Sequence, residues 1–122
     1  MNGPTDTSIA PPRLAHLYAR SGWGTEAERL LERALRSQAE GTFLVLVAPV
    51  GGEMHARARR VGLRVLPFET GFWPRRQLAM DLQEFSLTRL VAHDPLAFAL
   101  GKWLRRRLGI PLAPPAEASP AP

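Results

Sequence analysis

Residues 14–28, with the sequence LAHLYARSGWGTEAE, decide the predicted fold of this 122-residue chain. The mostly apolar residues 14–18 predict a strand, and the Gly-Trp-Gly turn at residues 22–24 predicts a tight loop after it. Thr25 and Glu28 then form a capping-box pattern, which predicts the start of a helix. A strand, a glycine loop and a helix in this order are typical of the first unit of a parallel α/β sheet.

Three further strand–helix units are expected along the chain. Residues 43–48 (FLVLVA) are apolar at every position, which favours a strand covered on both faces. The other expected strands are residues 63–68, 89–92 and a fifth beginning within 109–112. The expected helices run from Thr25 to Gly41, over residues 53–61, from Pro74 to Phe85 after a loop at 69–73, and from Pro95 to Gly109. Three of them have a predicted apolar inner face. These faces are formed by Ala27, Leu30, Leu31, Ala34 and Leu35 in the first helix, by Leu78, Ala79, Leu82 and Phe85 in the third, and by Leu96, Leu100, Leu104 and Leu108 in the fourth.

Strands joined by helices run parallel, with right-handed crossovers. The sequence therefore predicts a three-layer α/β sandwich around a Rossmann-like sheet of four or five strands in the order 3-2-1-4-5. We expect one domain at residues 13–112, a flexible lead-in at 1–12 and a disordered Ala/Pro tail at 113–122. Ligands of such sheets bind where the strand order reverses, which brings residues 21–25 close to His93 and Asp94.

Composition limits the class of protein. The chain has no cysteine, no apolar run of about 20 residues and no secretory signal at its start, so a cytoplasmic location is expected. The net charge is +5, and Lys102 is the only lysine among the basic residues. An arginine-rich composition is explained either by a GC-rich genome or by affinity for phosphate-bearing partners. We expect no cofactor and no metal, because the three histidines lack metal-ligand spacing.

The glycine loop is the first candidate site. Backbone N–H groups at a helix start form a natural phosphate or carboxylate site, which makes Gly22, Trp23, Gly24 and Thr25 candidate substrate- or phosphate-binding residues. The loop is neither a dinucleotide fingerprint, since the third glycine is absent, nor a P-loop, since no Gly-Lys-Ser/Thr follows. The alternative is a plain tight turn.

Histidines and a basic aromatic cluster supply the other candidates. His93, at the carboxyl end of the fourth strand, is the candidate catalytic residue, with a structural or merely exposed histidine as the alternative. Asp94 is expected to cap the following helix, His16 to be a hydrogen-bonded core or edge side chain, and His55 to face solvent. Four residues at 72–76 are candidate contacts to an acceptor or a membrane interface, with plugging of the sheet end as an equal alternative: Phe72, Trp73, Arg75 and Arg76.

Residues 14–112 resemble the N-terminal domain of family 4 glycosyltransferases, two-domain enzymes of the GT-B architecture. Within the first stretch, Glu28 and Arg29 match the family's Glu-Arg pair if one residue is inserted. Five stretches carry the resemblance in the family's order: residues 17–33 (LYARSGWGTEAERLLER), 44–49 (LVLVAP), 61–67 (VGLRVLP), 90–95 (LVAHDP) and 104–112 (LRRRLGIPL).

The resemblance implies an acceptor-binding lobe. Gly22 and Gly24 would take the role of the family's glycine loop, which approaches the donor's phosphates and the acceptor, and His93 that of a cleft histidine which contacts the donor sugar or the acceptor. The implied partners are a nucleotide-sugar-binding lobe and a glycan or glycolipid acceptor. The chain departs from the family by lacking that second lobe and by the bulky Trp23 in the loop. Little or no transferase activity is therefore expected of this polypeptide alone.

Two other functions remain open from the sequence. A non-catalytic α/β module could self-associate or bind a protein partner through an uncovered sheet edge or helix face. A nucleic-acid or anionic-membrane binder could use the arginines, but these are spread over several helices, so no specific nucleic acid and at most peripheral membrane contact are expected.

Overall fold

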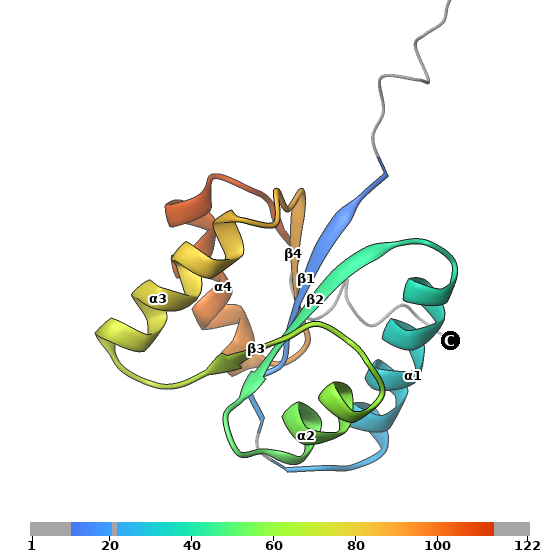
Figure 1. The fold of residues 1–122 in the computed structure, drawn as a ribbon. Coiled ribbons are helices and arrows are strands. Elements are labelled where there is room, and N and C mark those ends of the chain that lie inside the picture. The colour runs from blue at the N-terminus through green and yellow to red at the C-terminus, as the bar shows by residue number, and fades with distance from the viewer. Residues whose placement is uncertain (1–10, 21, 114–122) are drawn as a thin grey trace, which may run out of the picture.

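The computed structural model describes residues 11–20 and 22–113, so most of the expected tail at 113–122 and most of the expected lead-in at 1–12 lie outside the described residues; Ala113 itself belongs to a strand. Strands and helices alternate through the described part (Figure 1). The elements are β1 (Arg13–Leu17), α1 (Thr25–Ala39), β2 (Phe43–Pro49), α2 (Glu53–Arg60), β3 (Val65–Phe68), α3 (Phe72–Gln83), β4 (Arg89–Ala92), α4 (Pro95–Leu108) and β5 (Leu112–Ala113).

All strand pairs are parallel, and the sheet order is β3-β2-β1-β4-β5. The predicted fold class and strand order are therefore confirmed. The central strand β1 pairs on both sides, with Leu17 opposite Val47 of β2 and Ala92 of β4. Figure 1 shows α1 and α2 on one face of the sheet and α3 and α4 on the other, which completes three layers.

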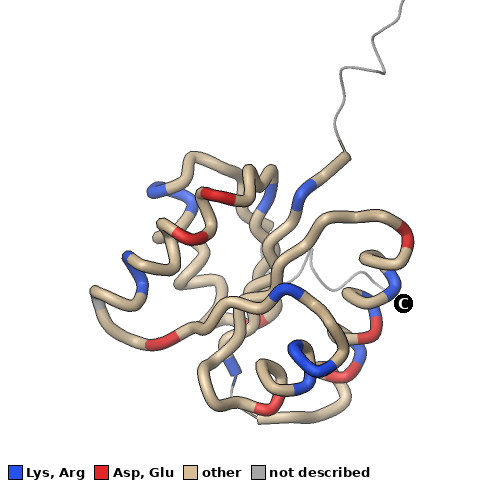
Figure 2. Tube along the Cα trace, viewed as in Figure 1, with Lys and Arg blue, Asp and Glu red and all other residues tan. Residues whose placement is uncertain are grey.

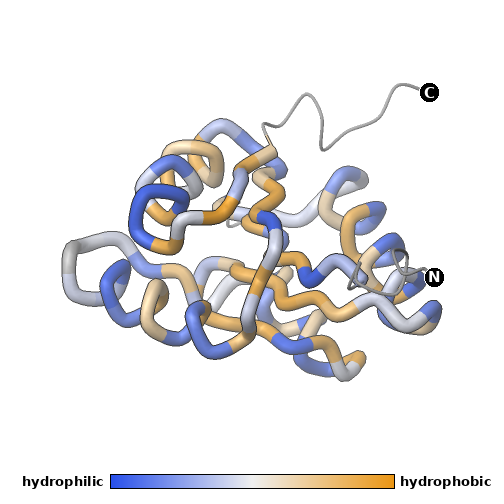
Figure 3. The backbone as a smooth tube through the Cα atoms, turned by 90° about the horizontal axis from the view of Figure 1, so that it is seen from above, coloured by the Kyte–Doolittle hydropathy of each residue, from blue (hydrophilic) through white to orange (hydrophobic). Residues whose placement is uncertain are grey.

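Each face of the sheet has its own apolar core, and the apolar strands run through the middle of the molecule (Figure 3). Strand β2 contributes to both cores because it is covered on both sides, as its continuous apolar sequence predicts. The core under α3 and α4 includes Ala15, Leu17, Val45, Val47, Leu78, Leu82, Leu90, Ala92, Leu100 and Leu104. The core under α1 and α2 includes Tyr18, Leu30, Leu31, Ala34, Leu44, Leu46, Ala48 and Met54.

The start of α1 differs from the prediction. Its N-cap is Gly24, which makes no side-chain hydrogen bond, and Thr25 is already the first helical residue. The capping-box prediction for Thr25 and Glu28 is therefore wrong by one position. The prediction for α4 is confirmed, because the side chain of Asp94 accepts a hydrogen bond from the Ala97 N–H and Gly109 ends the helix at φ 70°.

Two other helix predictions need correction. Helix α3 begins at Phe72, two residues before Pro74, because Gly71 at φ 116° turns the chain out of the loop earlier than expected. The inner face of α4 is formed by Ala97, Leu100, Gly101 and Leu104, whereas Leu96 is 56% exposed. Leu96 is one residue out of phase with this face, so it turns toward solvent.

Candidate functional site

The candidate site lies at the carboxyl ends of β1 and β4, where the strand order reverses. The backbone N–H of His93 donates to the Leu17 carbonyl at 3.0 Å, which continues the β1–β4 pairing beyond the strands. Asp94 is 2% exposed, and its side chain joins the segment after β1 to the first turn of α4. One of its carboxylate oxygens accepts from the Ala19 N–H at 2.9 Å and the other from the Ala97 N–H at 2.8 Å. This fixes His93 beside the loop that follows β1.

His93 forms a pair with His16 of β1. Nδ1 of His16 and Nε2 of His93 are 2.8 Å apart, and the ring centroids are 5.0 Å apart at an interplanar angle of 31°. The prediction that His16 is a hydrogen-bonded side chain is confirmed. A single proton between the two nitrogens makes one ring the donor and the other the acceptor, so the tautomers of the two rings depend on one another.

Burial and positive charge keep both imidazoles neutral. Burial, followed by the charge of Arg33, lowers the pKa of His16 from 6.5 to about 4. Burial, followed by His16 and then Arg33, lowers the pKa of His93 to about 3. At neutral pH the pair therefore offers hydrogen bonds without carrying charge.

A groove opens beside this pair on the side of the sheet covered by α1. Its larger cavity, of about 320 Å³, is lined by Tyr18, Glu26, Arg29, Leu30, Glu32, Arg33, Arg36 and His93. A smaller cavity, of about 150 Å³, is lined by His16, Leu30, Arg33, Ala34, Ser37, Val91 and His93. We call these two cavities together the α1 groove. They share Leu30, Arg33 and His93, so His93 faces both.

The glycine loop lines a neighbouring cavity of about 350 Å³. Its walls include Gly22, Trp23, Gly24 and Thr25, together with Tyr18, Arg20, Glu26 and Ala27. The Tyr18 hydroxyl donates to the Gly22 carbonyl at 3.1 Å, and burial raises its pKa. Trp23 packs toward α2, where the guanidinium carbon of Arg57 lies 4.4 Å from the centre of the indole ring.

The loop and His93 therefore lie at the same edge of the sheet but line separate cavities, which share Tyr18 and Glu26. The expectation of one crevice lined by Trp23 and His93 is corrected to two adjoining cavities with Tyr18 between them. The indole of Trp23 packs on Arg57 rather than on the histidine pair.

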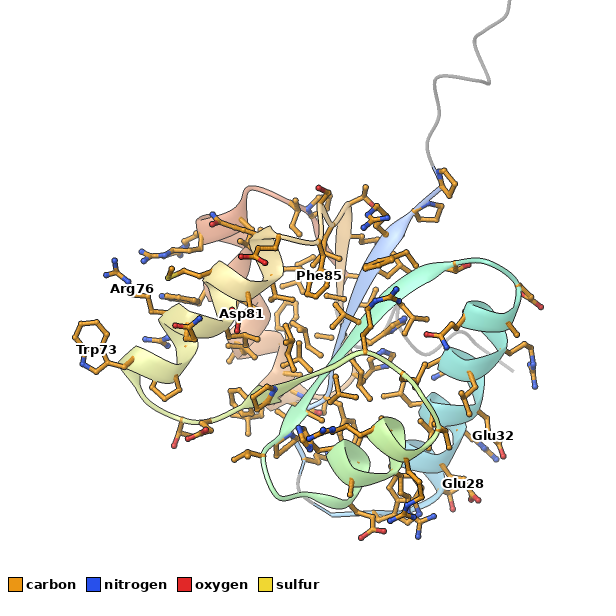
Figure 4. All side chains as sticks on the ribbon, in the orientation of Figure 1. Glu28, Glu32, Trp73, Arg76, Asp81 and Phe85 are labelled. Atoms are coloured by element: carbon orange, nitrogen blue, oxygen red, sulfur yellow. The ribbon has the colours of Figure 1, made fainter. Side chains whose placement is uncertain are left out.

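The basic aromatic cluster at residues 72–76 divides between surface and core. Trp73 is 72% exposed, and both Trp73 and Arg76 project away from the molecule at the start of α3 (Figure 4). Arg75 turns inward, with its guanidinium carbon 4.6 Å from the ring centre of Trp103. The side chain of Phe72 lies outside the described part. Of the three members of this cluster whose side chains are described, Trp73 and Arg76 are placed to meet an external partner.

His55 on α2 is half-buried, so the prediction that it faces solvent is met only in part. Among residues 11–20 and 22–113, no group of three or more His, Cys, Asp or Glu side chains is arranged to hold a metal ion. No helix within the same residues is long and apolar enough to cross a membrane.

Sequence reasoning missed the groove itself. The sequence predicts that His16 is hydrogen-bonded but does not identify its partner, and the predicted site residues do not include Tyr18 or the arginines of α1. The available signal was Arg29, Arg33 and Arg36 at i, i+4 and i+7, which places them along one side of the helix.

Comparisons with known proteins agree with the fold. No protein-family model matches the sequence, and no curated protein is significantly similar to it. Among solved structures, MurG of Acinetobacter baumannii aligns with a TM-score of 0.64 at 14% identity over 83% of this chain and 34% of that one. A glycosyltransferase of Rickettsia africae aligns with a TM-score of 0.67 at 10% identity over 85% of this chain and 29% of that one.

The chain thus spans about a third of the length of each matched structure. The matched part is the N-terminal domain of a GT-B architecture, so the fold resemblance stated from the sequence is confirmed.

Proposed function

We propose that this chain is the acceptor-binding lobe of a glycosyltransferase and works with a nucleotide-sugar-binding lobe. The observation that carries the proposal is the pair of cavities at the point where the strand order reverses, one lined by His93 and one by the glycine loop. The proposal includes a glycan or glycolipid acceptor and a role in glycan biosynthesis. A cytoplasmic location is part of it, since a chain without cysteine suits a reducing compartment.

The proposed role of His93 is a hydrogen bond to the acceptor or donor sugar. A base with a pKa of about 3 removes protons poorly at neutral pH. A neutral ring held by His16 at 2.8 Å, in contrast, keeps a fixed orientation and leaves its Nδ1 atom for a ligand. We therefore assign His93 to binding a sugar hydroxyl rather than to proton removal.

The proposed role of the glycine loop is to hold a phosphate of the donor or acceptor. The N-cap of α1 is Gly24, so no side chain competes for the first N–H groups of the helix. The first residues of the helix, Thr25, Glu26 and Ala27, line the same cavity as Gly22, and the helix dipole favours negative charge there. Glu26 in the same wall is paired with Arg20 at 3.4 Å, which reduces its repulsion of an anion.

The same edge of the sheet offers apolar surface for a second lobe. Val50 follows β2, Leu96 follows β4, and Trp73 lies at the start of the helix after β3; these side chains are 53%, 56% and 72% exposed. Exposed apolar side chains gathered at one edge favour contact with a partner. A lobe docked there would close over both cavities and exclude water from the reaction, as group transfer requires.

The test is reconstitution of transfer. The full chain is purified alone and together with a separately produced GT-B nucleotide-sugar-binding lobe, and each sample is given radiolabelled nucleotide sugars and a glycolipid extract. We expect no turnover by the chain alone and sugar transfer or donor hydrolysis by the pair. His93→Ala in the pair should lower the rate at least about tenfold, the effect of losing a hydrogen bond to the reacting sugar.

His55→Ala is the matched control, because this histidine lies on α2 and lines neither cavity. It should leave the rate within about twofold of the parent. A pair that binds but neither transfers nor hydrolyses any donor would overturn the proposal. So would a His93→Ala pair as active as the parent.

A further inference from the structure

The α1 groove carries a distribution of charge that the proposed transferase role does not require. Arg29, Arg33 and Arg36 line it from one helix and span about 10 Å, given a rise of about 1.5 Å per residue. All three side chains are exposed. Figure 2 shows the basic and acidic residues that alternate along α1.

These arginines are not neutralised within the described part of the chain. The ion pairs there are Arg20–Glu26 and Arg57–Glu53, and neither involves Arg29, Arg33 or Arg36. Glu26, one of the two carboxylates in the groove wall, is already bound to Arg20. Glu32 is the other, so three arginines face one available carboxylate. The groove therefore carries a net positive charge.

His93 adds a directional group to this charge. Its Nε2 atom is held by His16, and no hydrogen bond joins its Nδ1 atom to another residue of the described ranges. When the Nδ1–H of His16 donates a hydrogen bond to Nε2 of His93, a neutral His93 carries its own proton on Nδ1. That Nδ1–H is then available as a hydrogen-bond donor. A bound anion selects that tautomer, because a negatively charged oxygen needs a donor and not a lone pair.

The groove also has an apolar part. Leu30 is 3% exposed and Tyr18 is 6% exposed, and together with Val91 they form the floor and one end. A ligand that fits has an anionic group on the arginine side and an apolar or ring portion against this floor.

We infer that the α1 groove binds the phosphate group of a small ligand, through Arg33 and its neighbours Arg29 and Arg36 and through Nδ1 of His93. Several guanidinium groups beside one neutral donor suit a phosphate dianion better than a single carboxylate, because each guanidinium can hold two oxygens. The site shares Nδ1 of His93 with the sugar hydroxyl assigned above, so one ligand occupies that atom at a time. Phosphate binding here does not depend on a second lobe and can fail independently of sugar transfer. The phosphate can belong to a soluble compound or to a lipid headgroup.

The experiment measures binding of two probes to the full chain. Pyrophosphate in millimolar amounts is titrated calorimetrically, and vesicles that contain phosphatidic acid, whose headgroup is a phosphomonoester, are tested by co-sedimentation. Arg33→Gln should weaken binding about tenfold or more, the usual loss when one charge-assisted hydrogen bond to an anion is removed. Arg106→Gln is the matched control, since it removes the same charge from the last turn of α4, on the opposite face of the sheet, and it should change binding less than about twofold.

A second readout follows the histidines directly. Pyrophosphate should shift the imidazole NMR signals of His93 and His16 and raise their pKa values, because a nearby anion stabilises the protonated ring. His55 should not respond. Binding of pyrophosphate assigns the site to a soluble phosphate compound, and Arg33-dependent binding to vesicles alone assigns it to a lipid headgroup. Equal losses in Arg33→Gln and Arg106→Gln, or no binding of either probe, would overturn the inference.

Discussion

The two faces of β1 and β4 are built from alternating residues of the same strands, yet they differ in composition and packing. On the α3/α4 face these strands contribute Ala15, Leu17, Leu90 and Ala92, which are fully buried. On the α1 face they contribute His16, Val91 and His93, which are only partly covered and line the α1 groove. One pair of strands therefore supplies both a close-packed core and an open polar groove.

The difference shows how the fold separates stability from binding. The packed face leaves no spare room, because a Cβ added at Gly101 of α4 would lie 2.6 Å from Leu112 Cδ1 and 3.2 Å from Leu17 Cδ1. The groove face tolerates polar and titratable side chains, because α1 covers only part of it and the cavities leave the rest accessible to water. We therefore expect substitutions on the two faces to have different consequences, and the following predictions test that expectation.

The largest effect is expected for Leu104→Ala on the packed face. Leu104 is 0% exposed, so truncation leaves a cavity that its rigid surroundings cannot fill. The free energy of unfolding should fall by about 3–4 kcal/mol, measured by urea denaturation.

The matched substitution on the groove face is Val91→Ala. This side chain is half-buried, and its surroundings can relax into the groove, so the loss should be about 1 kcal/mol or less. Equal losses in the two variants would mean that the groove face is as closely packed as the other, and the comparison would fail.

Asp94→Ala should have the second-largest effect. The carboxylate is buried and accepts from the backbone N–H groups of Ala19 and Ala97, which lie on different segments of the site. Loss of both bonds leaves two backbone donors without their partner and should cost about 2–3 kcal/mol in urea denaturation. Asp94→Asn keeps one acceptor oxygen but sets its NH2 group against the second backbone N–H, so its loss should be close to that of alanine. A loss below about 0.5 kcal/mol in Asp94→Ala would show that these two hydrogen bonds do not stabilise the junction.

The fold could be predicted from the sequence because its signals are local. The continuous apolar run of β2, the Asp94-Pro95 helix start and the glycine at Gly109 each specify one element. Once the order of elements is known, chain connectivity restricts a parallel sheet to few strand orders. The errors at Leu96 and at the start of α3 come from a one- or two-residue shift in helix phase, which side-chain pattern alone does not fix.

The site could be predicted only in part because it depends on register between distant strands. The strand order placed β1 beside β4, but the hydrogen bond between His16 and His93 needs a register in which Leu17 faces Ala92. A shift of one residue would have turned one of the histidines to the packed face. The register results from packing on both faces, so no single sequence motif reports it.

The histidine pair predicts acid sensitivity of the groove face. In the unfolded chain each histidine has a pKa near 6.5, whereas in the folded protein the values are about 4 for His16 and about 3 for His93. The unfolded state therefore binds more protons as the pH falls below 6.5, and stability is lost from there down to the folded pKa values. We expect a loss of about 2 kcal/mol between pH 6.5 and pH 5.5, since each such histidine contributes about 1 kcal/mol over that interval and up to about 1.4 kcal/mol per pH unit below it.

The charged groups that face the histidine pair either lower its pKa values further or are too few to raise them back to the unfolded value. Besides Arg33, the titratable side chains lining the groove are Tyr18, Glu26, Arg29, Glu32 and Arg36. Urea denaturation across the pH range measures the slope. His93→Gln should reduce it, and His55→Gln on α2 should leave it unchanged; a slope that is the same in all three proteins would contradict the buried neutral pair.

The smallest effect is expected at the start of α1, the helix that covers the groove face. The helices of the two faces begin differently, since Asp94 caps α4 with its side chain and Gly24 caps α1 without one. Thr25→Ala should change the free energy of unfolding by less than about 0.5 kcal/mol, because Thr25 is exposed and is not the N-cap. Gly24→Ser, which supplies a capping oxygen in extended backbone at φ −172°, should stabilise the helix by a few tenths of a kcal/mol or more.

A loss of about 1 kcal/mol in Thr25→Ala would show that threonine does cap α1 in solution. An N–H group of the first turn of α1 would then be occupied by the threonine side chain. The glycine loop would have fewer free donors for a phosphate than its proposed role requires.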